Sequence, residues 1–546
     1  MVLKRTFPSI NGDSGMKYLL AALSLFIASP SYATSIKASY VVNATSVVVL
    51  YLAFCGWFIW RHQQKAAQHL LENNLVNANA NMRDAYCILI AYASQTGNGE
   101  QLAKKTAESL KAAGLAIELH PLSKINAAML YTFTRALFVV STTGEGDAPD
   151  NAREFLTEVM HQNTRFPNLK YGILALGDAS YSHFCGFGHT LATWLQHTHA
   201  IPLFDMVEVN RNDDGALRHW QYQLSVLAQD TEMADWKTPD YQRWKLTSRV
   251  QLNKGSVGAP AYHLSLSSQK KNMRWQAGDI AEVGPRNSPQ SVDSFLQHLG
   301  LDGTIQTESS MTLRDALQDK LLPHDEAGFN VLNGLSIEAI LLALKTLPHR
   351  EYSIASIPQD GQLELLVRQT HYADGRLGIG SGWLTEYATV KGQIALRIRE
   401  NTAFHPPPNE IPLILIGNGT GIAGLRAHLK ARILAGLGNN WLIFGERHAE
   451  HDFYFKEELL AWQNQGLITR LETAFSRDQV NRFYVQNIVS SSAAEIKKWV
   501  ADGAAIYVCG SASGMAPAVH NHLLEILGEA TLSALTASGR YRRDVY

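Results

Sequence analysis

The chain has 546 residues, of which 46% are hydrophobic and 18% charged, and its formal net charge is −1 at pH 7. This length exceeds one domain and suggests three or four units, each able to bury a core. The balanced charge gives no support for a nucleic-acid partner. The four cysteines form no CxxC pair and indicate reduced thiols rather than disulfides or a metal site: Cys55, Cys87, Cys185 and Cys509.

The first 39 residues have the pattern of a targeting segment. A charged start precedes the apolar run Tyr18–Ala28, and Ser31-Tyr32-Ala33 has the small residues of a cleavage site. The true start is Met1 or Met16, and both a cleaved segment and a retained anchor fit the pattern.

Residues 40–60 form one apolar run that is long enough to cross a hydrocarbon core of about 30 Å. The alternative is a buried core helix, which seldom shows such uninterrupted apolar length. Arg61 and Lys65 follow, and positive charge after a span places the next part of the chain in the cytoplasm. We therefore expect a single-pass protein of a bacterial-type inner membrane, with residues 61–83 as a spacer before cytoplasmic catalytic domains.

Residues 84–228 have the pattern of an open α/β sheet. A buried-type strand starts at Cys87 and is followed by the hydroxyl- and glycine-rich turn Ser94–Gly99, then by a helix. Such a turn offers backbone N–H groups to a phosphate at a helix start. No lysine follows in the Walker position, which disfavours a nucleoside triphosphate. A single turn of this kind is also common as a purely structural feature.

Two further buried strands, 136–140 and 172–177, end in the loops 141–147 and 178–185. Loops at the carboxyl ends of parallel strands form the ligand crevice of an open sheet. The strings SQTGNGE, TTGEGDAPDNA and LGDASYSHF resemble the flavodoxin-like domain of diflavin reductases. The resemblance implies FMN, with its phosphate on Ser94, Gln95, Thr96, Gly97 and Asn98 and its ring between Gly144 and Tyr181. Thr143 stands where microsomal members of the family carry an aromatic residue, and Tyr181 could alternatively be a surface aromatic.

A linker over 229–244 and a flavin-binding β-barrel over 245–407 are expected next. Gln276-Ala-Gly-Asp279 resembles a turn of ferredoxin-reductase-type barrels, and the strings REYSIAS and GIGSGWL follow later. The resemblance implies FAD, with Arg350, Gly378 and Ser381 on its pyrophosphate, Tyr352 against the flavin and Ser353 near N5. Residues from about 290 to 347 have helical patterns at 292–300, 312–321 and 336–347, similar to a shortened helical connecting domain.

Residues 408–546 predict a Rossmann-like domain. A buried strand at 412–416 leads into a glycine-rich turn with Gly419 and Thr420, and then a helix, which is the arrangement of a pyrophosphate site. Two arginines with hydroxyl groups suit a dianion, and the resemblance implies the 2′-phosphate of NADPH. The alternative is a solvated basic turn. The group comprises Ser476, Arg477, Arg482 and Tyr484.

The last 45 residues contain the string YVCG followed by an alanine and a methionine, and the ending RRDVY. By resemblance, Cys509 lies beside the nicotinamide, and Asp544 joins Ser353 and Cys509 around the hydride path. The aromatic ring of Tyr546 would stack on FAD and swing aside for the nicotinamide.

Taken together, the motifs resemble those of diflavin reductases, the family of NADPH–haemoprotein reductases and sulfite reductase flavoproteins. The resemblance implies an α/β multidomain enzyme behind one transmembrane helix, in which electrons pass from NADPH to FAD, FMN and a one-electron protein acceptor. A haemoprotein or redox partner at the membrane is the first expectation for that acceptor. The alternatives are the flavoprotein component of a sulfite reductase, or a binding module without turnover, which would require inactive NADPH motifs.

Overall fold

The computed structural model describes residues 87–546 except positions 96, 163, 182, 231, 238–239, 269–272, 408–409 and 513. The predicted targeting segment, membrane span and spacer therefore lie outside the described residues, as does Thr96. Among the described residues, no helix combines the length and apolar character needed to cross a membrane. The described residues belong to one compact unit.

The first sheet is parallel and has the strand order β2-β1-β3-β4, with β5 and β6 both beside β4. Because β1 lies between β2 and β3, the winding reverses between β1 and β3, which opens a crevice at their carboxyl ends. The strands are β1 (Ile88–Ala93), β2 (Ile117–Pro121), β3 (Arg135–Ser141), β4 (Lys170–Gly177), β5 (Ile201–Pro202) and β6 (Val207–Asn210).

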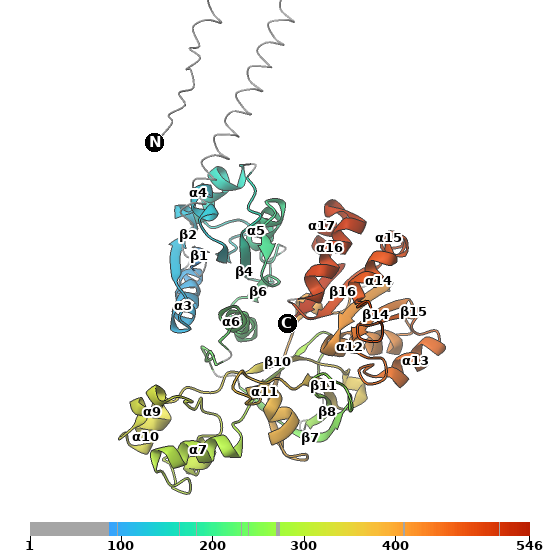
Figure 1. Ribbon diagram of the computed structural model, residues 1–546. Coiled ribbons are helices and arrows are strands. Elements are labelled where there is room, and N and C mark those ends of the chain that lie inside the picture. Colours follow the sequence, from blue (N-terminus) through green and yellow to red (C-terminus); the bar gives the residue numbers. More distant parts are fainter. Residues whose placement is uncertain are drawn as a thin grey trace, which may run out of the picture. The chain divides into compact units, whose positions relative to one another are not determined.

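Helices cover both faces of this sheet (Figure 1). Apolar side chains of α3 (Asn98–Ala112) and α6 (Asp214–Ala228) form the core on one face, and those of α4 (Ala127–Tyr131) and α5 (Gly186–His197) form it on the other. The strands are buried on both faces, which explains their continuous apolar sequences.

The second sheet is antiparallel, with the order β10-β9-β12-β7-β8-β11. Its edges meet at a bridge between Ile354 and Leu365, so the sheet curls into a barrel. The strands are β7 (Gln242–Gln251), β8 (Ala261–Ser268), β9 (Ile280–Gly284), β10 (Arg350–Ser353), β11 (Leu363–Arg368) and β12 (Gln393–Arg399). β7 starts inside the predicted linker, because its pairing with β12 extends back to Gln242.

Four helices lie between β9 and β10 and share a small core of their own. They are α7 (Pro289–Leu299), α8 (Leu313–Ala316), α9 (Glu326–Leu332) and α10 (Ile337–Ala343). The prediction of a helix over 312–321 was too long, and α9 was not predicted. Helices of one or two turns bury too few positions to give a clear helical period. Side-chain caps mark both starts instead: Thr312 accepts from Asp315 N, and Asp325 from Gly328 N.

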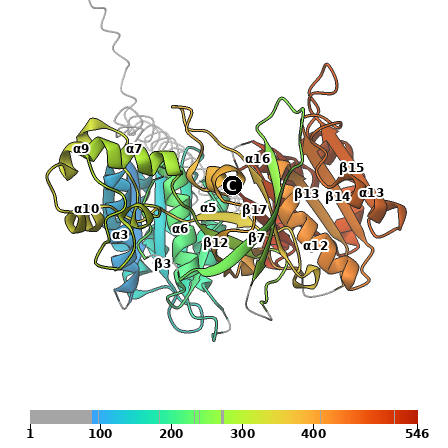
Figure 2. The same ribbon diagram turned by 90° about the horizontal axis from the view of Figure 1, so that it is seen from below.

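The third sheet is parallel, with the order β15-β14-β13-β16-β17. Its strands are β13 (Leu413–Asn418), β14 (Asn440–Glu446), β15 (Arg470–Phe475), β16 (Ala505–Gly510) and β17 (Tyr541–Val545). Helices α12 (Ile422–Leu434) and α13 (Lys456–Asn464) cover one face (Figure 2). Helices α14 (Val485–Ser491), α15 (Ala493–Ala501), α16 (Met515–Leu527) and α17 (Glu529–Ala537) contribute to the core on the other.

A buried network of charges joins α6 of the first sheet to the barrel. Arg218 pairs with Glu282 at 3.0 Å, and both side chains are at most 2% exposed. Arg399 pairs with Glu351 at 3.1 Å, and Glu351 also contacts His219 Nδ1 at 2.8 Å. Three of these side chains could in principle hold a metal ion, because the ligand-type atoms of Glu282, His349 and Glu351 lie within 4.8 Å of one another. Guanidinium groups contact both carboxylates, so we interpret the cluster as ion pairs rather than a metal site. We call the whole cluster the α6 network; it comprises Arg218, His219, Asp235, Glu282, His349, Glu351 and Arg399.

One member of the α6 network makes stability depend on pH. Burial would lower the pKa of His349, but the contacts with Asp235 (2.8 Å) and Glu351 (3.5 Å) outweigh burial and raise it to about 9 from the ordinary 6.5. A raised folded-state pKa gives stability that is complete below about pH 6.5 and lost as the pH rises through about 9.

We expect the free energy of unfolding to fall by about 2 kcal/mol between pH 7 and 9. Urea denaturation at the two pH values measures the change. The variant His349→Gln cannot change charge and should lose this slope, so an unchanged slope in it would assign the titration to another group.

Candidate flavin and nicotinamide sites

The loops after β1 and β3 lie side by side at the crevice of the first sheet. Ser94 Oγ accepts hydrogen bonds from the backbone N–H groups of Gly97 and Gly99, both at 3.1 Å. Gln95 Nε2 donates to Asp150 at 3.1 Å, and Asp150 N donates back to Gln95 Oε1 at 3.2 Å. These two hydrogen bonds therefore join the loop after β1 to the loop after β3.

The start of α3 suits an anion. Its N-cap residue is Gly97, in the left-handed region with φ +84°, which has no side chain of its own to cap the helix. Ser94 Oγ accepts from the N–H groups of Gly97 and Gly99, and the positive dipole end of the helix fits a phosphate. Asn98 is fixed beside it through its side-chain amide, which donates to Asn212 at 3.0 Å.

The predicted ring-binding residues lie on the two neighbouring loops. Thr143 N donates to Asp147 O at 2.8 Å, which closes a tight turn, and Gly144 at its tip has φ +52°. Tyr181 follows β4 and is 47% exposed, so its ring is open to solvent or to a ligand. All the described residues predicted for FMN thus gather at the carboxyl edge of the first sheet.

The two predicted FAD motifs meet in space. A Cβ atom added to Gly380 would lie 2.5 Å from Arg350 Cγ and 2.6 Å from Tyr352 Oη, so this position requires glycine. Ser381 is buried and its hydroxyl contacts Thr370 N at 3.1 Å and Thr370 Oγ1 at 2.9 Å. The Ser381 hydroxyl therefore holds the turn that starts at Gly378, and the backbone of that turn lies beside Arg350.

Three of the four predicted catalytic side chains come together although they belong to different sheets. Ser353 Oγ donates to Asp544 Oδ2 at 2.9 Å, and Cys509 Sγ lies 3.7 Å from the same oxygen. Burial raises the pKa of Asp544, whereas the hydrogen bond from Ser353 lowers it, and the net direction is upward. Burial and the nearby Asp544 raise the pKa of the Cys509 thiol well above its ordinary value.

The fourth predicted catalytic residue, Tyr546, lies at the glycine-rich turn. Its hydroxyl donates to Thr420 Oγ1 at 3.2 Å, and its side chain is 42% exposed. The turn itself is tight, because a Cβ atom on Gly421 would lie 2.2 Å from Cys509 O. Tyr546 and Cys509 thus flank the same turn.

Removal of the Tyr546 ring should strengthen nicotinamide binding. If the ring covers the flavin, NADPH must displace it, and an aromatic stack is worth about 0.5–1.5 kcal/mol, or roughly two- to tenfold in affinity. We expect Tyr546→Ala to bind NADP⁺ and NADH more tightly by that factor. Titration of both nucleotides measures it, with Tyr546→Phe as the control that keeps the ring. Unchanged affinities in the alanine variant would place the ring elsewhere.

Arg368 is a residue that sequence reasoning missed. It extends from β11 of the barrel, pairs with Glu446 at the end of β14, and donates to Tyr454 Oη at 3.0 Å. A Cβ atom on Gly419 would lie 3.5 Å from Arg368 Nη2. Arg368 therefore adds a cation to the glycine-rich turn. It belongs to no motif, and only the packing of two sheets brings it there.

The group predicted for the 2′-phosphate lies on one turn after β15. Ser476 is buried and bonds to Glu446 O through its backbone N–H at 2.9 Å and its hydroxyl at 3.2 Å. The side chains of Arg477, Arg482 and Tyr484 are exposed. Arg447 lies at the end of the next strand, and its carbonyl accepts from Arg477 N at 2.9 Å. The turn thus offers two open guanidinium groups, those of Arg477 and Arg482, while the backbone of Arg447 holds it in place.

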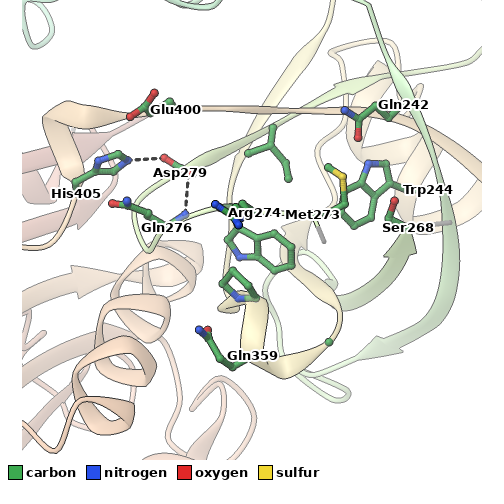
Figure 3. Close-up of a pocket in the computed structure, with 14 residues that line it drawn as sticks. Gln242, Trp244, Ser268, Met273, Arg274, Gln276, Asp279, Gln359, Glu400 and His405 are labelled. Carbon is green, nitrogen blue, oxygen red and sulfur yellow. Dashed lines mark hydrogen bonds and ion pairs between the residues drawn. The ribbon is translucent and has the colours of Figure 1, made fainter. Parts of the chain in front are cut away.

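The Gln276–Asp279 turn lines a different hollow, of about 1070 Å³, together with residues of the barrel strands β7 and β8 (Figure 3). Asp279 accepts from His405 Nε2 at 2.6 Å and from Gln276 N at 2.8 Å, as the dashed lines show. Trp244 and Met273 are among the other residues of its wall. None of the residues that line this hollow belongs to the predicted site residues, so the turn serves to tie the barrel to the segment after β12.

Two parallel sheets with anion-type turns at their switch points, and a barrel between them, define an oxidoreductase that binds flavin and nicotinamide cofactors. The flavodoxin family model matches residues 90–220, and the oxidoreductase NAD-binding domain model matches residues 415–521. The first match covers the first sheet apart from the start of β1, and the second covers the third sheet apart from the start of β13 and the strand β17.

Curated relatives match most of the chain. The sulfite reductase [NADPH] flavoprotein alpha-component of Vibrio vulnificus (strain CMCP6) is 29% identical, over 91% of this chain and 93% of its own. Those of Vibrio cholerae (strain ATCC 39541) and Shewanella sp. (strain ANA-3) are 30% identical, over 84% and 85% of this chain and 87% and 90% of their own. The chain belongs to the diflavin reductase family, and it uses FMN, FAD and NADPH.

When bound, the two flavins convert the hydride of NADPH into single electrons. The protein supplies position and charge. Ser353 and Cys509 both donate to the Asp544 carboxylate, and these two contacts fix the orientation of that carboxylate between the barrel and the third sheet. The Cys509 thiol beside Asp544 is itself closed to bulk water, because Cys509 is 0% exposed.

Proposed function

We propose that this chain is a membrane-anchored, NADPH-dependent diflavin reductase that delivers single electrons from FMN to a haemoprotein or other redox protein at the inner membrane. FAD lies on Arg350, Tyr352, Ser353 and the turn from Gly378 to Ser381. FMN lies in the crevice of the first sheet, and NADPH reaches FAD past Tyr546. The observation that carries this proposal is the contact between Ser353, Cys509 and Asp544, which joins a flavin-type barrel to a nicotinamide-type sheet.

The exposed edge of the first sheet supports a protein acceptor. Tyr181 and Gly144 lie open at that edge, so a flavin bound between them would be reached from outside. The apolar run over residues 40–60 supports an anchor, because its length matches a bilayer core and positive charge follows it.

A second candidate is the flavoprotein component of a sulfite reductase. The names of the relatives favour it, since each of those cited is a sulfite reductase flavoprotein alpha-component. In this case the acceptor would be the haemoprotein partner of such an enzyme, and the apolar run would have no necessary role in electron transfer.

The two candidates predict different partners. The full chain, carrying an affinity tag, is captured from solubilised membranes and from the soluble fraction, and the captured protein is examined by absorption spectroscopy. The first candidate predicts a membrane haem protein that becomes reduced when NADPH is added. A sirohaem spectrum with NADPH-dependent sulfide formation would support the second and contradict the first. A chain that starts at residue 81 should lose membrane capture only in the first case.

A further inference from the structure

Successive side chains of the strand β17 and the residue after it contact the first sheet domain, the barrel and the segment between the barrel and the third sheet. Arg542 donates to Thr402 O at 2.7 Å, on the segment between the barrel and the third sheet. Arg543 pairs with Asp205 of the first sheet domain, 338 positions earlier. Asp544 accepts from Ser353 of the barrel. Tyr546, directly after the strand, donates to Thr420.

Successive side chains of a β-strand point to opposite faces, so Arg543 and Asp544 lie on opposite sides of β17. Arg543 therefore faces the flavodoxin-like domain and Asp544 faces the hydride path, and the same stretch of backbone positions both side chains. The register of that backbone is set by β16, where Val508 pairs with Arg543 and Cys509 with Asp544. A displacement of Arg543 must thus displace Asp544 and Tyr546 as well.

Asp205, the partner of Arg543, belongs to the flavodoxin-like domain, so the ion pair forms only when that domain is docked. Asp205 lies in the short loop between β5 and β6, and α6 with its buried contacts to the barrel follows directly after β6. The ion pair is only partly open to water, with side-chain exposures of 19% for Arg543 and 36% for Asp205. Arg543 also lies over the ring of Tyr541, at 5.9 Å from its centroid, which limits the directions that its side chain can take.

We propose that Arg543 is a positioning residue for hydride transfer: by pairing with Asp205, it makes the placement of Asp544 and Tyr546 depend on the docked flavodoxin-like domain. The step concerned is the oxidation of NADPH to NADP⁺ with transfer of its hydride to FAD. Efficient NADPH oxidation is then linked to the presence of the domain that takes the electrons onward. This step precedes the acceptor, so the test below does not depend on which acceptor is correct.

The informative variant is Asp205→Asn, because Asp205 lies outside the predicted cofactor sites and the substitution removes only its charge. Stopped-flow measurement of FAD reduction at saturating NADPH should show a rate lowered about three- to tenfold, with the dissociation constant for NADPH unchanged. High salt should slow the wild type toward the variant, since salt screens a partly exposed pair. Asp205→Glu should restore most of the rate.

Hydrogen exchange supplies a readout that does not involve turnover. The amides of residues 541–546 should exchange faster in Asp205→Asn than in the wild type, although the substitution lies in another domain. The control is Asp214→Asn, which removes an exposed ion pair between Asp214 at the start of α6 and Lys237. It should change neither the rate nor the exchange.

Two results would overturn the proposal. A wild-type rate of FAD reduction in Asp205→Asn would show that the pair has no influence on hydride transfer. A slower rate with unchanged exchange at residues 541–546, or an equal effect of Asp214→Asn, would show that the influence does not pass through the position of the strand.

Discussion

Replacement of Glu282 by alanine is expected to lower the free energy of unfolding by about 3–5 kcal/mol, the range for removal of one partner from a buried ion pair. Glu282 is fully buried, and it lies 3.0 Å from Arg218 and 3.6 Å from Arg399. Arg399 keeps Glu351 as a partner in the variant, but Arg218 would stay desolvated and lose the carboxylate with which it pairs. The penalty for an uncompensated buried charge dominates this expectation.

Urea denaturation of the full chain measures the loss, and an exposed pair provides the comparison. Asp293 pairs with Arg314 in the helical insert, with side-chain exposures of 55% and 46%. Asp293→Ala should lower stability by about 1 kcal/mol or less, as expected for a surface pair. If Glu282→Ala had no larger effect than Asp293→Ala, the α6 network would not support the docking of α6 on the barrel.

Replacement of Arg477 by alanine is expected to weaken NADPH use roughly 10- to 150-fold while leaving NADH use nearly unchanged. The exposed turn after β15 offers Arg477 and Arg482 to a ligand, and Ser476 anchors the turn to Glu446. A charge-assisted contact with a 2′-phosphate is worth about 1.5–3 kcal/mol, which gives this factor. NADH has no such phosphate and cannot lose the contact.

The ratio of kcat/KM for NADPH and NADH, measured with ferricyanide as the electron acceptor, tests this expectation. Arg470→Ala is a suitable control, because Arg470 lies at the opposite end of β15 and pairs with Glu472 at 3.0 Å. The control should leave the ratio unchanged. An equal loss for both nucleotides in Arg477→Ala would assign this arginine to the folding of the turn rather than to the phosphate.

The loops of the two parallel sheets could be predicted because each is continuous in sequence. A buried strand, a glycine-rich turn and a helix start within about 15 residues identify a phosphate-type turn, and the turns at Ser94 and Gly419 follow β1 and β13 as expected. Ser353, Cys509 and Asp544 were predicted together only from resemblance, and the structure brings them into contact.

Features that depend on the packing of distant segments could not be predicted. Arg218 and Glu282 are 64 positions apart, and Arg543 and Asp205 are 338 apart. The local sequence around each of these residues is like that of an ordinary exposed charged residue, so neither composition nor hydrophobic periodicity predicts that they are buried. Short helices such as α9 are missed for a different reason, because a tertiary contact rather than a helical period stabilises them.

The burial of Cys509 has a consequence for oxidative damage. Reduced flavins react with dioxygen, and the peroxide that results attacks thiolates rather than neutral thiols. Because the Cys509 side chain is 0% exposed and its pKa is raised well above the ordinary value, it stays a neutral thiol and is protected from such an oxidant. Alkylating reagents should therefore modify Cys509 only when its neighbours Ser353, Gly424 and Asp544 move apart, which makes this cysteine a chemical reporter of opening between the barrel and the third sheet.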